Sequence, residues 1–216
     1  LIDKYIGNLF CTFLALFKQK SIDNKQIGKI LVIQLWGIGE TILILPAIEA
    51  LRRKFPKATI DLLSTSRNKD VFFNNKNIDK IIEIKLNPFS ALIFILKNIK
   101  KYDLVIDMEE YLNISAIISF FVGKKSIGYS HNSRAKLYTQ KIRYNDKQHA
   151  IRTFLDLVRA LDIVDNVEKL PKLNFSKKDK KFIDKFLKIN GIKNNDFVVC
   201  VAPGAAESAK ARMWPY

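Results

Sequence analysis

The chain has 216 residues, of which 48% are hydrophobic and 27% are charged, so it can form one sizeable core and is neither disordered nor of low complexity. Its 37 Lys and Arg against 21 Asp and Glu give a net charge of +16, which favours nucleic acid, an anionic membrane or a phosphorylated substrate as partners, or a solvated lysine-rich surface. The only cysteines, Cys11 and Cys200, are far apart and no His or Cys stands in a metal-binding spacing, so we expect no metal site and no disulfide framework.

An amphipathic leader is the first predicted element, over residues 1–25, with its helix over 1–20. The apolar run at 9–17 is shorter than the roughly 20 residues that a membrane-spanning helix needs. Two interpretations remain open: the helix lies on an anionic membrane surface, or it packs on the domain that follows. The residues at helical spacing are Ile2, Ile6, Phe10, Phe13, Leu14 and Phe17.

Short apolar runs then alternate with helical patterns. We predict strands over 29–35, 58–64, 80–85 and 103–107, and helices over 41–55, 67–74, 88–99 and 111–122. This order indicates an α/β fold with a parallel sheet. Residues 124–145 are basic and irregular, and a further helix is predicted over 148–162.

A boundary follows this region, because residues 165–176 show no periodicity. Ser176 and Asp179 form a capping box for a helix that ends at Gly191. Residues 197–216 then predict an apolar strand, a small-residue turn and the start of another helix. The chain begins with Leu1 and stops where this second α/β unit has only begun, so we expect it to be a piece of a longer protein.

The turn at Gly37-Ile38-Gly39-Glu40 has two possible uses. A dinucleotide-binding turn has a third small residue where this chain has Ile42, and Glu40 would oppose a bound diphosphate. A carboxylate at the end of the first strand would instead face a substrate and could accept a proton from an attacking hydroxyl. Glu40 could also simply complement the helix dipole.

Further charged residues are predicted near the same edge. Asp107 and Glu109 end a buried strand and point to the same edge, although acidic residues there are often only solvated. Arg134 and Lys136 could hold an anionic acceptor or belong to a solvated loop. His149 is interpreted as a helix cap and Cys200 as a core residue.

Residues 30–63 resemble the opening of glycosyltransferase family 9, the lipopolysaccharide heptosyltransferase group. The shared features are a hydrophobic strand, a turn with glycine and an acidic residue, and the motifs "PAIEALR" and "FPKA". "YDLVID", "GKKSIGYS", "HAIRTFLDLV" and "PGAAESAKARMWP" follow in the family's order, so that the resemblance covers most of residues 28–216.

The resemblance implies the GT-B architecture, with two Rossmann-like domains and an active site between them. We expect an N-terminal acceptor domain over 28–164, a linker and helix over 165–195, and the start of a donor domain over 196–216. The fragment alone is expected to be inactive, because most of the donor pocket would follow it.

By position, the resemblance makes Glu40 the catalytic base of an inverting transfer, although the family usually has Asp there. Acceptor binding would involve the turn and the residues beyond it, and donor phosphates would meet the later turn. The implied acceptor residues are Gly37, Gly39, Asp107, Arg134 and Lys136, and the implied donor residues are Gly204, Ala205, Ala206 and Arg212.

The resemblance further implies heptose transfer from ADP-heptose to a lipopolysaccharide or lipid-linked saccharide acceptor, without metal or cofactor. The enzyme would be cytoplasmic and peripheral to the inner membrane of a bacterium, bound to an anionic membrane surface and not to nucleic acid. Two alternatives remain: a non-catalytic Rossmann-like module that binds an anionic glycan or lipid, and an NAD-dependent enzyme.

Overall fold

A computed structural model describes residues 2–17, 27–164, 169–193, 195–201, 204 and 213. The chain divides into two compact units, residues 1–174 and 175–216. The first unit is built around a parallel β-sheet, and the second contains the helix α7. None of the helices in the described ranges is long and apolar enough to cross a membrane.

The sheet of the first unit has six strands in the order β3-β2-β1-β4-β5-β6, and every neighbouring pair is parallel. The chain therefore builds outward from β1 to β3, then returns to the other side of β1 with β4. In parallel α/β sheets, ligands bind beyond the carboxyl ends of the strands where the order reverses. The strands are β1 Lys29–Ile33, β2 Thr59–Ser64, β3 Lys80–Glu83, β4 Tyr102–Asp107, β5 Gly123–Tyr129 and β6 Gln140–Ile142.

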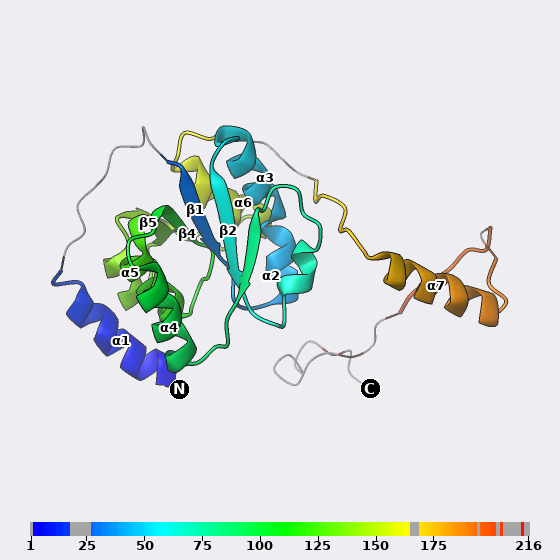
Figure 1. Cartoon of the computed structure of the whole chain (residues 1–216), viewed down its shortest axis with the longest axis horizontal. Helices are drawn as coiled ribbons and strands as arrows, with labels where there is room; N and C mark the ends of the chain where they lie inside the picture. The colour runs from blue at the N-terminus through cyan, green and yellow to red at the C-terminus, as the bar shows by residue number, and fades with distance from the viewer. Residues whose placement is uncertain are drawn as a thin grey trace. The chain divides into compact units, whose positions relative to one another are not determined.

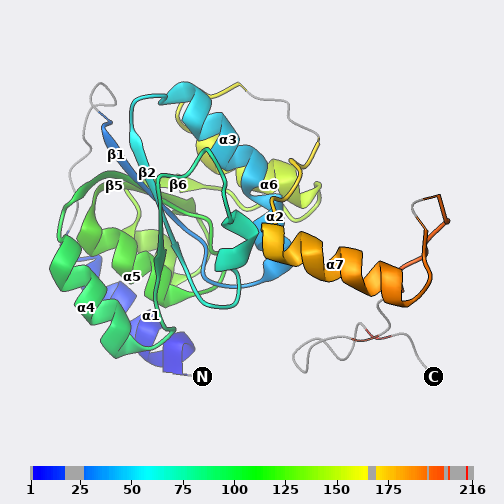
Figure 2. The same cartoon turned by 45° about the vertical axis from the view of Figure 1, so that its right-hand side comes forward.

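Helices cover both faces of this sheet (Figures 1 and 2). On one face lie α2 (Ile38–Leu43), α3 (Leu45–Lys54) and α6 (Ala150–Arg159), and a hydrophobic core is buried there against β1, β2, β4 and β5. On the other lie α4 (Pro88–Asn98) and α5 (Asn113–Val122), which bury a second core. Because β1 and β4 are buried on both faces, their sequences read as continuous apolar runs.

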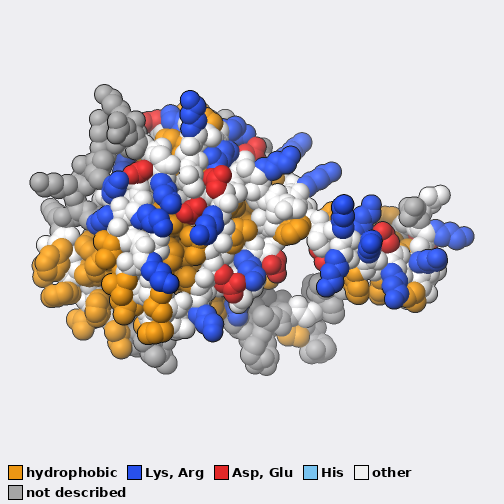
Figure 3. Space-filling view, in the orientation of Figure 1, with side chains coloured by type: hydrophobic (Ala, Val, Ile, Leu, Met, Phe, Trp, Pro, Cys, Tyr) orange, Lys and Arg blue, Asp and Glu red, His pale blue; other side chains and the backbone are white. Residues whose placement is uncertain are grey.

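The helix α1 (Ile2–Leu14) packs outside this sandwich, against α5 and the short 3-10 helix η3 (Ser133–Leu137). Cys11 and Leu14 are buried in this contact, which confirms that α1 packs on the domain that follows it. The opposite side of α1 exposes hydrophobic side chains, and Figure 3 shows such side chains gathered over α1 and α4.

The predicted fold class is confirmed, and several elements differ from the prediction. The helix predicted over 41–55 is two helices that meet at Ile44, because Pro46 has no N–H to donate to the preceding turn. The pattern at 67–74 forms only the 3-10 helix η2 (Lys69–Phe72).

The basic stretch 124–145, predicted to be irregular, contributes the strands β5 and β6. Small residues hide this from the apolar pattern: a Cβ on Gly128 would overlap the ring of Tyr138, and Ser126 is fully buried. The pairing of β5 with β4 and of β6 with β5 therefore depends on long-range packing rather than on local propensity.

The second unit contains α7 (Lys177–Ile189), and the predicted capping box between Ser176 and Asp179 is present. The strand predicted at 197–201 is wrong for this structure, since these residues have no regular secondary structure and are exposed. A strand forms only with a neighbour to pair with, and none lies in the described part of this unit. Cys200 is accordingly exposed and not a core residue.

Candidate functional site

The candidate site lies at the carboxyl edge of the sheet, where the strand order reverses between β1 and β4. Ile33 at the end of β1 pairs with Asp107 at the end of β4. The turn at 37–40 follows β1, and residues 108–111 follow β4, so both segments emerge side by side. The topology thus places Glu40 and the carboxylates of β4 at one edge, as the sequence predicts.

Gly37 permits the sharp turn from β1 into α2. Its backbone has φ 73° and ψ 119°, a left-handed φ that non-glycine residues rarely adopt. A Cβ at this position would overlap the Glu40 carboxylate, so the Glu40 side chain lies directly over Gly37. Glu40 itself is exposed in the first turn of α2. The turn therefore presents a carboxylate to solvent at the predicted ligand-binding edge.

Buried side chains from the loop after β2 hold this turn. Asn68 donates from Nδ2 to the Gln34 carbonyl and to the Thr41 Oγ1, both at 2.9 Å. Thr41 in turn donates to the Gly37 carbonyl at 2.5 Å, and Thr65 donates to the Leu35 carbonyl at 3.0 Å. Thr65 and Asn68 were not predicted from the sequence. The signal available was a run of polar residues, "STSRN", directly after a buried strand.

Glu109 fixes the same turn from the β4 side. Its carboxylate accepts hydrogen bonds from the backbone N–H of Leu35 and, at 2.7 Å, from that of Trp36. Burial, reinforced by the nearby Asp107 charge, raises the pKa of Glu109 from its ordinary 4.5 to about 7. A carboxyl group that titrates near neutral pH thus lies directly beneath the candidate site.

Asp107 and Arg134 form a buried ion pair, with 2.8 Å between Arg134 Nη2 and Asp107 Oδ2. Neither side chain has any exposed surface, because Ser115 and Tyr138 enclose the pair. Burial, with Asp107 beside it, raises the pKa of Tyr138 well above its usual value, so its hydroxyl stays protonated and donates to Asp107 at 2.6 Å.

This burial differs from the exposed basic loop that the sequence predicts for Arg134. In this conformation neither Arg134 nor Asp107 has exposed side-chain atoms, and their predicted contact with an acceptor stays a prediction. Their geometry assigns them to positioning: Asp107 Oδ1 accepts from the Glu109 N–H at 3.1 Å and so orients the residue that holds the turn. Lys136, in contrast, is exposed on η3, and Gly39 is exposed in α2.

Aromatic side chains line the exposed rim of the edge. Trp36 is 45% exposed, and the Arg67 guanidinium lies 4.1 Å from its ring centroid. Tyr111 is 68% exposed and packs edge-on against His131, whose Nε2 donates to the Glu110 carbonyl at 2.7 Å. A hydrogen bond to the Glu110 carboxylate raises the pKa of Tyr111 to about 12. Neither Trp36 nor Tyr111 was predicted from the sequence as a site residue.

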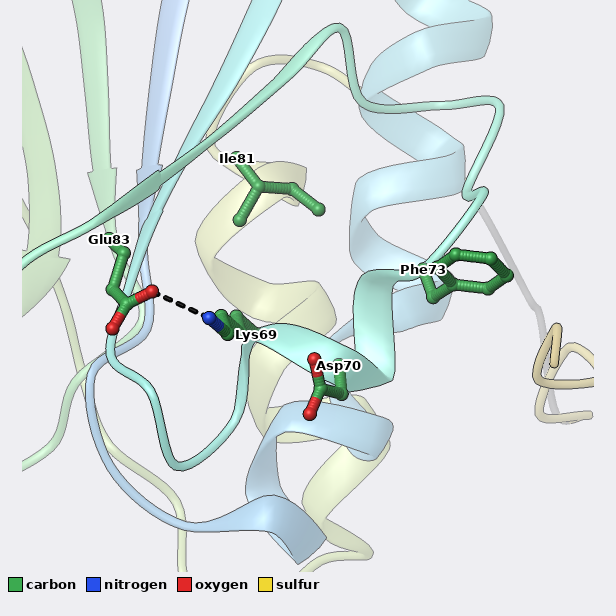
Figure 4. A pocket seen from close by; sticks show the side chains of 5 residues that line it. All are labelled: Lys69, Asp70, Phe73, Ile81 and Glu83. Carbon is green, nitrogen blue, oxygen red and sulfur yellow. Dashed lines mark hydrogen bonds and ion pairs between the residues drawn. The ribbon is translucent and has the colours of Figure 1, made fainter. Parts of the chain in front are cut away.

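A separate open hollow of about 300 Å³ lies between η2 and β3 (Figure 4). Lys69 and Glu83 in its lining are paired at 2.7 Å, and Asp70, Phe73 and Ile81 complete it. It contains none of the predicted site residues. Within the described ranges, no group of His, Cys, Asp or Glu is placed to hold a metal ion.

The family model for glycosyltransferase family 9 (heptosyltransferase) matches residues 95–216, more than half of the chain. The chain belongs to glycosyltransferase family 9. The match begins at residue 95 and so does not include the turn at 37–40. Any role for Glu40 must therefore be argued from the geometry described above. No curated protein sequence matches this family 9 chain.

Solved structures show the same fold as this family 9 chain. A glycosyl transferase family 9 protein from Veillonella parvula aligns with a TM-score of 0.69 and 20% identity, covering 78% of this chain and 51% of its own. E. coli ADP-heptose lps heptosyltransferase II aligns with a TM-score of 0.65 and 17% identity, covering 87% and 57%. E. coli heptosyltransferase WaaC with ADP-2-deoxy-2-fluoro heptose aligns with a TM-score of 0.55 and 16% identity, covering 68% of this chain and 50% of its own.

The family 9 chain thus spans about half the length of the solved structures that it matches. The predicted GT-B type of α/β fold is confirmed for this half. Among the residues predicted to meet donor phosphates, Gly204 is described and exposed. Ala205, Ala206 and Arg212 lie outside the described residues.

Proposed function

We propose that the protein is an inverting glycosyltransferase and that residues 28–164 form its acceptor domain. One observation supports this most strongly: the exposed carboxylate of Glu40 extends from a turn whose backbone is held by a buried hydrogen-bond network, at the edge where the strand order reverses. Family 9 membership supplies the class of reaction. The similarity to the two E. coli heptosyltransferases suggests heptose from ADP-heptose as the donor sugar and a lipopolysaccharide core-type acceptor.

In the proposed step, the acceptor hydroxyl attacks the anomeric carbon of the sugar while Glu40 accepts its proton. A C–O bond forms on one face of the carbon, and the bond to the nucleoside diphosphate breaks on the other. The diphosphate leaves with the bonding electrons, and the configuration inverts. General-base catalysis of this kind contributes about 10²- to 10⁴-fold to the rate.

The other predicted residues take supporting roles. The Gly37–Gly39 backbone would lie against the acceptor, and Lys136 would meet its anionic groups. The exposed rings of Trp36 and Tyr111 offer rigid amphipathic surfaces for a saccharide. Asp107 and Arg134 would position Glu109 and, through it, the turn. We propose no metal and no cofactor.

The donor side of the proposal involves the second α/β unit. Residues 165–195 would connect the domains, and residues 196–216 would begin the donor domain. The Gly204–Ala206 backbone and Arg212 would bind the donor diphosphate, since backbone N–H groups and guanidinium both suit phosphate oxygens. The enzyme would act in the cytoplasm at the inner membrane.

A transfer assay with the full-length protein tests this function. ADP-heptose, UDP-glucose and GDP-mannose are offered in turn with a lipopolysaccharide inner-core acceptor, and nucleotide release and product linkage are measured. We expect acceptor-dependent release of ADP and a product of inverted anomeric configuration. Glycan binding without turnover of any nucleotide sugar would instead indicate a binding module.

A further inference from the structure

The helix α1 is attached firmly to the acceptor unit through one side only. The Asp3 carboxylate accepts hydrogen bonds from the first backbone N–H groups of α5, those of Asn113 and Ile114, each at 2.9 Å. Gly7 allows the close approach, because a Cβ there would lie 2.8 Å from Asn113 Cβ. Cys11 and Leu14 complete the buried side. The position of α1 on the unit is therefore specified by packing and capping together.

The outer side of α1 is apolar and uncovered in the described part of the chain. Each of the large apolar side chains on this side is more than half exposed, at positions where a water-facing surface usually has polar groups. The exposed residues of this side are Ile6, Leu9, Phe10 and Phe13, followed directly after the helix by Leu16 and Phe17.

The neighbouring helix α4 has the same character. Ala91, Phe94 and Ile95 are buried against the sheet and α5, while a second set of apolar side chains faces outward. That outward set consists of Phe89, Leu92, Ile93, Leu96 and Ile99. Both helices flank α5, and hydrophobic side chains gather over them on this side of the molecule (Figure 3). Contiguous apolar surface of this kind marks an interaction site.

The charges around the surface favour an anionic partner. Residues 86–101 contain no Asp or Glu, whereas Lys97 and Lys101 are exposed near the end of α4. The one acidic residue of α1, Asp3, is used in capping α5. An apolar helix face flanked by lysines, without opposing carboxylates, is typical of helices that lie in the interface of an anionic membrane.

The same surface adjoins the candidate site. Helices that follow parallel strands begin at the carboxyl edge of the sheet, so α4 and α5 both begin there, after β3 and β4. Asp3 contacts the first residues of α5, which places the start of α1 at that edge as well. An acceptor carried in the bilayer would thus arrive at the sheet edge that carries Glu40.

We propose that α1 and α4 together form one docking surface for an anionic lipid bilayer. The surface holds the acceptor domain on the membrane with the carboxyl edge of the sheet at the headgroup level. This inference rests on the proposed function only where it explains why docking is useful, namely to bring the acceptor to the site. The docking itself needs no turnover. A second copy of the chain on the same surface is the competing occupant.

Vesicle sedimentation with the full-length protein tests the proposal. Phosphatidylglycerol–phosphatidylethanolamine vesicles are compared with phosphatidylcholine vesicles. The native protein is compared with two double variants, Leu92→Gln/Leu96→Gln on α4 and Leu9→Gln/Phe13→Gln on α1. Each pair is expected to lower the partition coefficient about tenfold or more, since two buried apolar side chains are lost from the bilayer. The matched control, Leu170→Gln/Leu173→Gln, changes two apolar side chains that are each 43% exposed and should alter binding less than about twofold.

Unchanged binding by either helix pair would contradict a shared surface, and a loss of dimer on light scattering with unchanged vesicle binding would identify a second copy as the occupant. Transfer to a water-soluble acceptor is measured in parallel and should be the same for all variants. If that transfer is absent while docking persists, the proposed function fails and this inference stands. If docking is absent while transfer persists, this inference fails and the proposed function stands.

Discussion

At the scale of single residues, the candidate site depends on two glutamates with different surroundings. Glu40 is exposed over a glycine turn, and Glu109 is buried beneath the same turn with its carboxylate bound to backbone N–H groups. The first is available to a substrate, whereas the second holds the backbone that presents it. Because the pKa of Glu109 is raised to about 7, the stability of this arrangement depends on pH.

Glu109→Gln tests that dependence. Between pH 4.5 and 7, the unfolded carboxyl loses its proton while the folded one keeps it, so the free energy of unfolding of the native protein falls as pH rises. From pH 4.5 to 7, the free energy of unfolding of the native protein should fall by about 3 kcal/mol more than that of the Gln variant. Urea unfolding at stepped pH measures it, with Glu49→Gln on the surface as the control. Parallel pH profiles for native protein and Glu109→Gln would contradict the buried carboxyl.

Some of these residues could be predicted from the sequence and others could not, for a physical reason. Glu40 follows a strand and a glycine turn within a few positions, so its place at the sheet edge is a local property. Arg134 looks like part of a solvated loop because its partner, Asp107, is 27 positions away. Thr65 and Asn68 act on backbone carbonyls across the sheet edge, a contact that no short motif describes.

At the scale of elements, the turn between β1 and α2 depends on the difference between its two glycines. Gly37 has φ 73°, and a Cβ there would overlap the Glu40 carboxylate. Gly39 lies inside α2, and a Cβ built on it meets nothing within 4 Å outside its own helix and chain neighbours in the described residues. The spacing of the glycines alone does not distinguish these roles.

Gly37→Ala and Gly39→Ala form a matched pair for this turn. The Gly37 variant is expected to lower the free energy of unfolding by about 1–2 kcal/mol, because a left-handed backbone strains any residue with a Cβ. The Gly39 variant should be neutral or stabilising by up to about 1 kcal/mol, because Ala favours a helix. Thermal unfolding measures both. Equal effects of the two substitutions would contradict the turn geometry.

The helices and strands themselves were predictable where the apolar pattern is strong. The four strands expected over 29–107 are all present, with bounds that differ by a few residues. The strands β5 and β6 escape prediction because their buried positions include Ser126 and Gly128 and because their neighbours supply the packing. The strand expected at 197–201 shows the reverse case, an apolar run without a partner in the described residues of its unit.

At the scale of the whole molecule, the basic charge and the exposed apolar surface support one account. The net charge of +16 suits anionic partners, and the α1–α4 surface adds apolar contact where acidic residues are lacking. Under the proposed function, the acceptor would bind at the carboxyl edge of this unit. The predicted roles of Gly204 and Arg212 belong to the donor half, and they stay predictions.

The central claim is that Glu40 is the base of the transfer, and Glu40→Gln in the full-length protein tests it most directly. The Gln side chain keeps the shape and removes the proton acceptor, while Glu49→Gln in the next helix controls for the loss of a carboxylate. We predict that kcat/KM falls about 10²- to 10⁴-fold for Glu40→Gln and stays near the native value for Glu49→Gln. A loss of less than about tenfold at Glu40 would contradict the account.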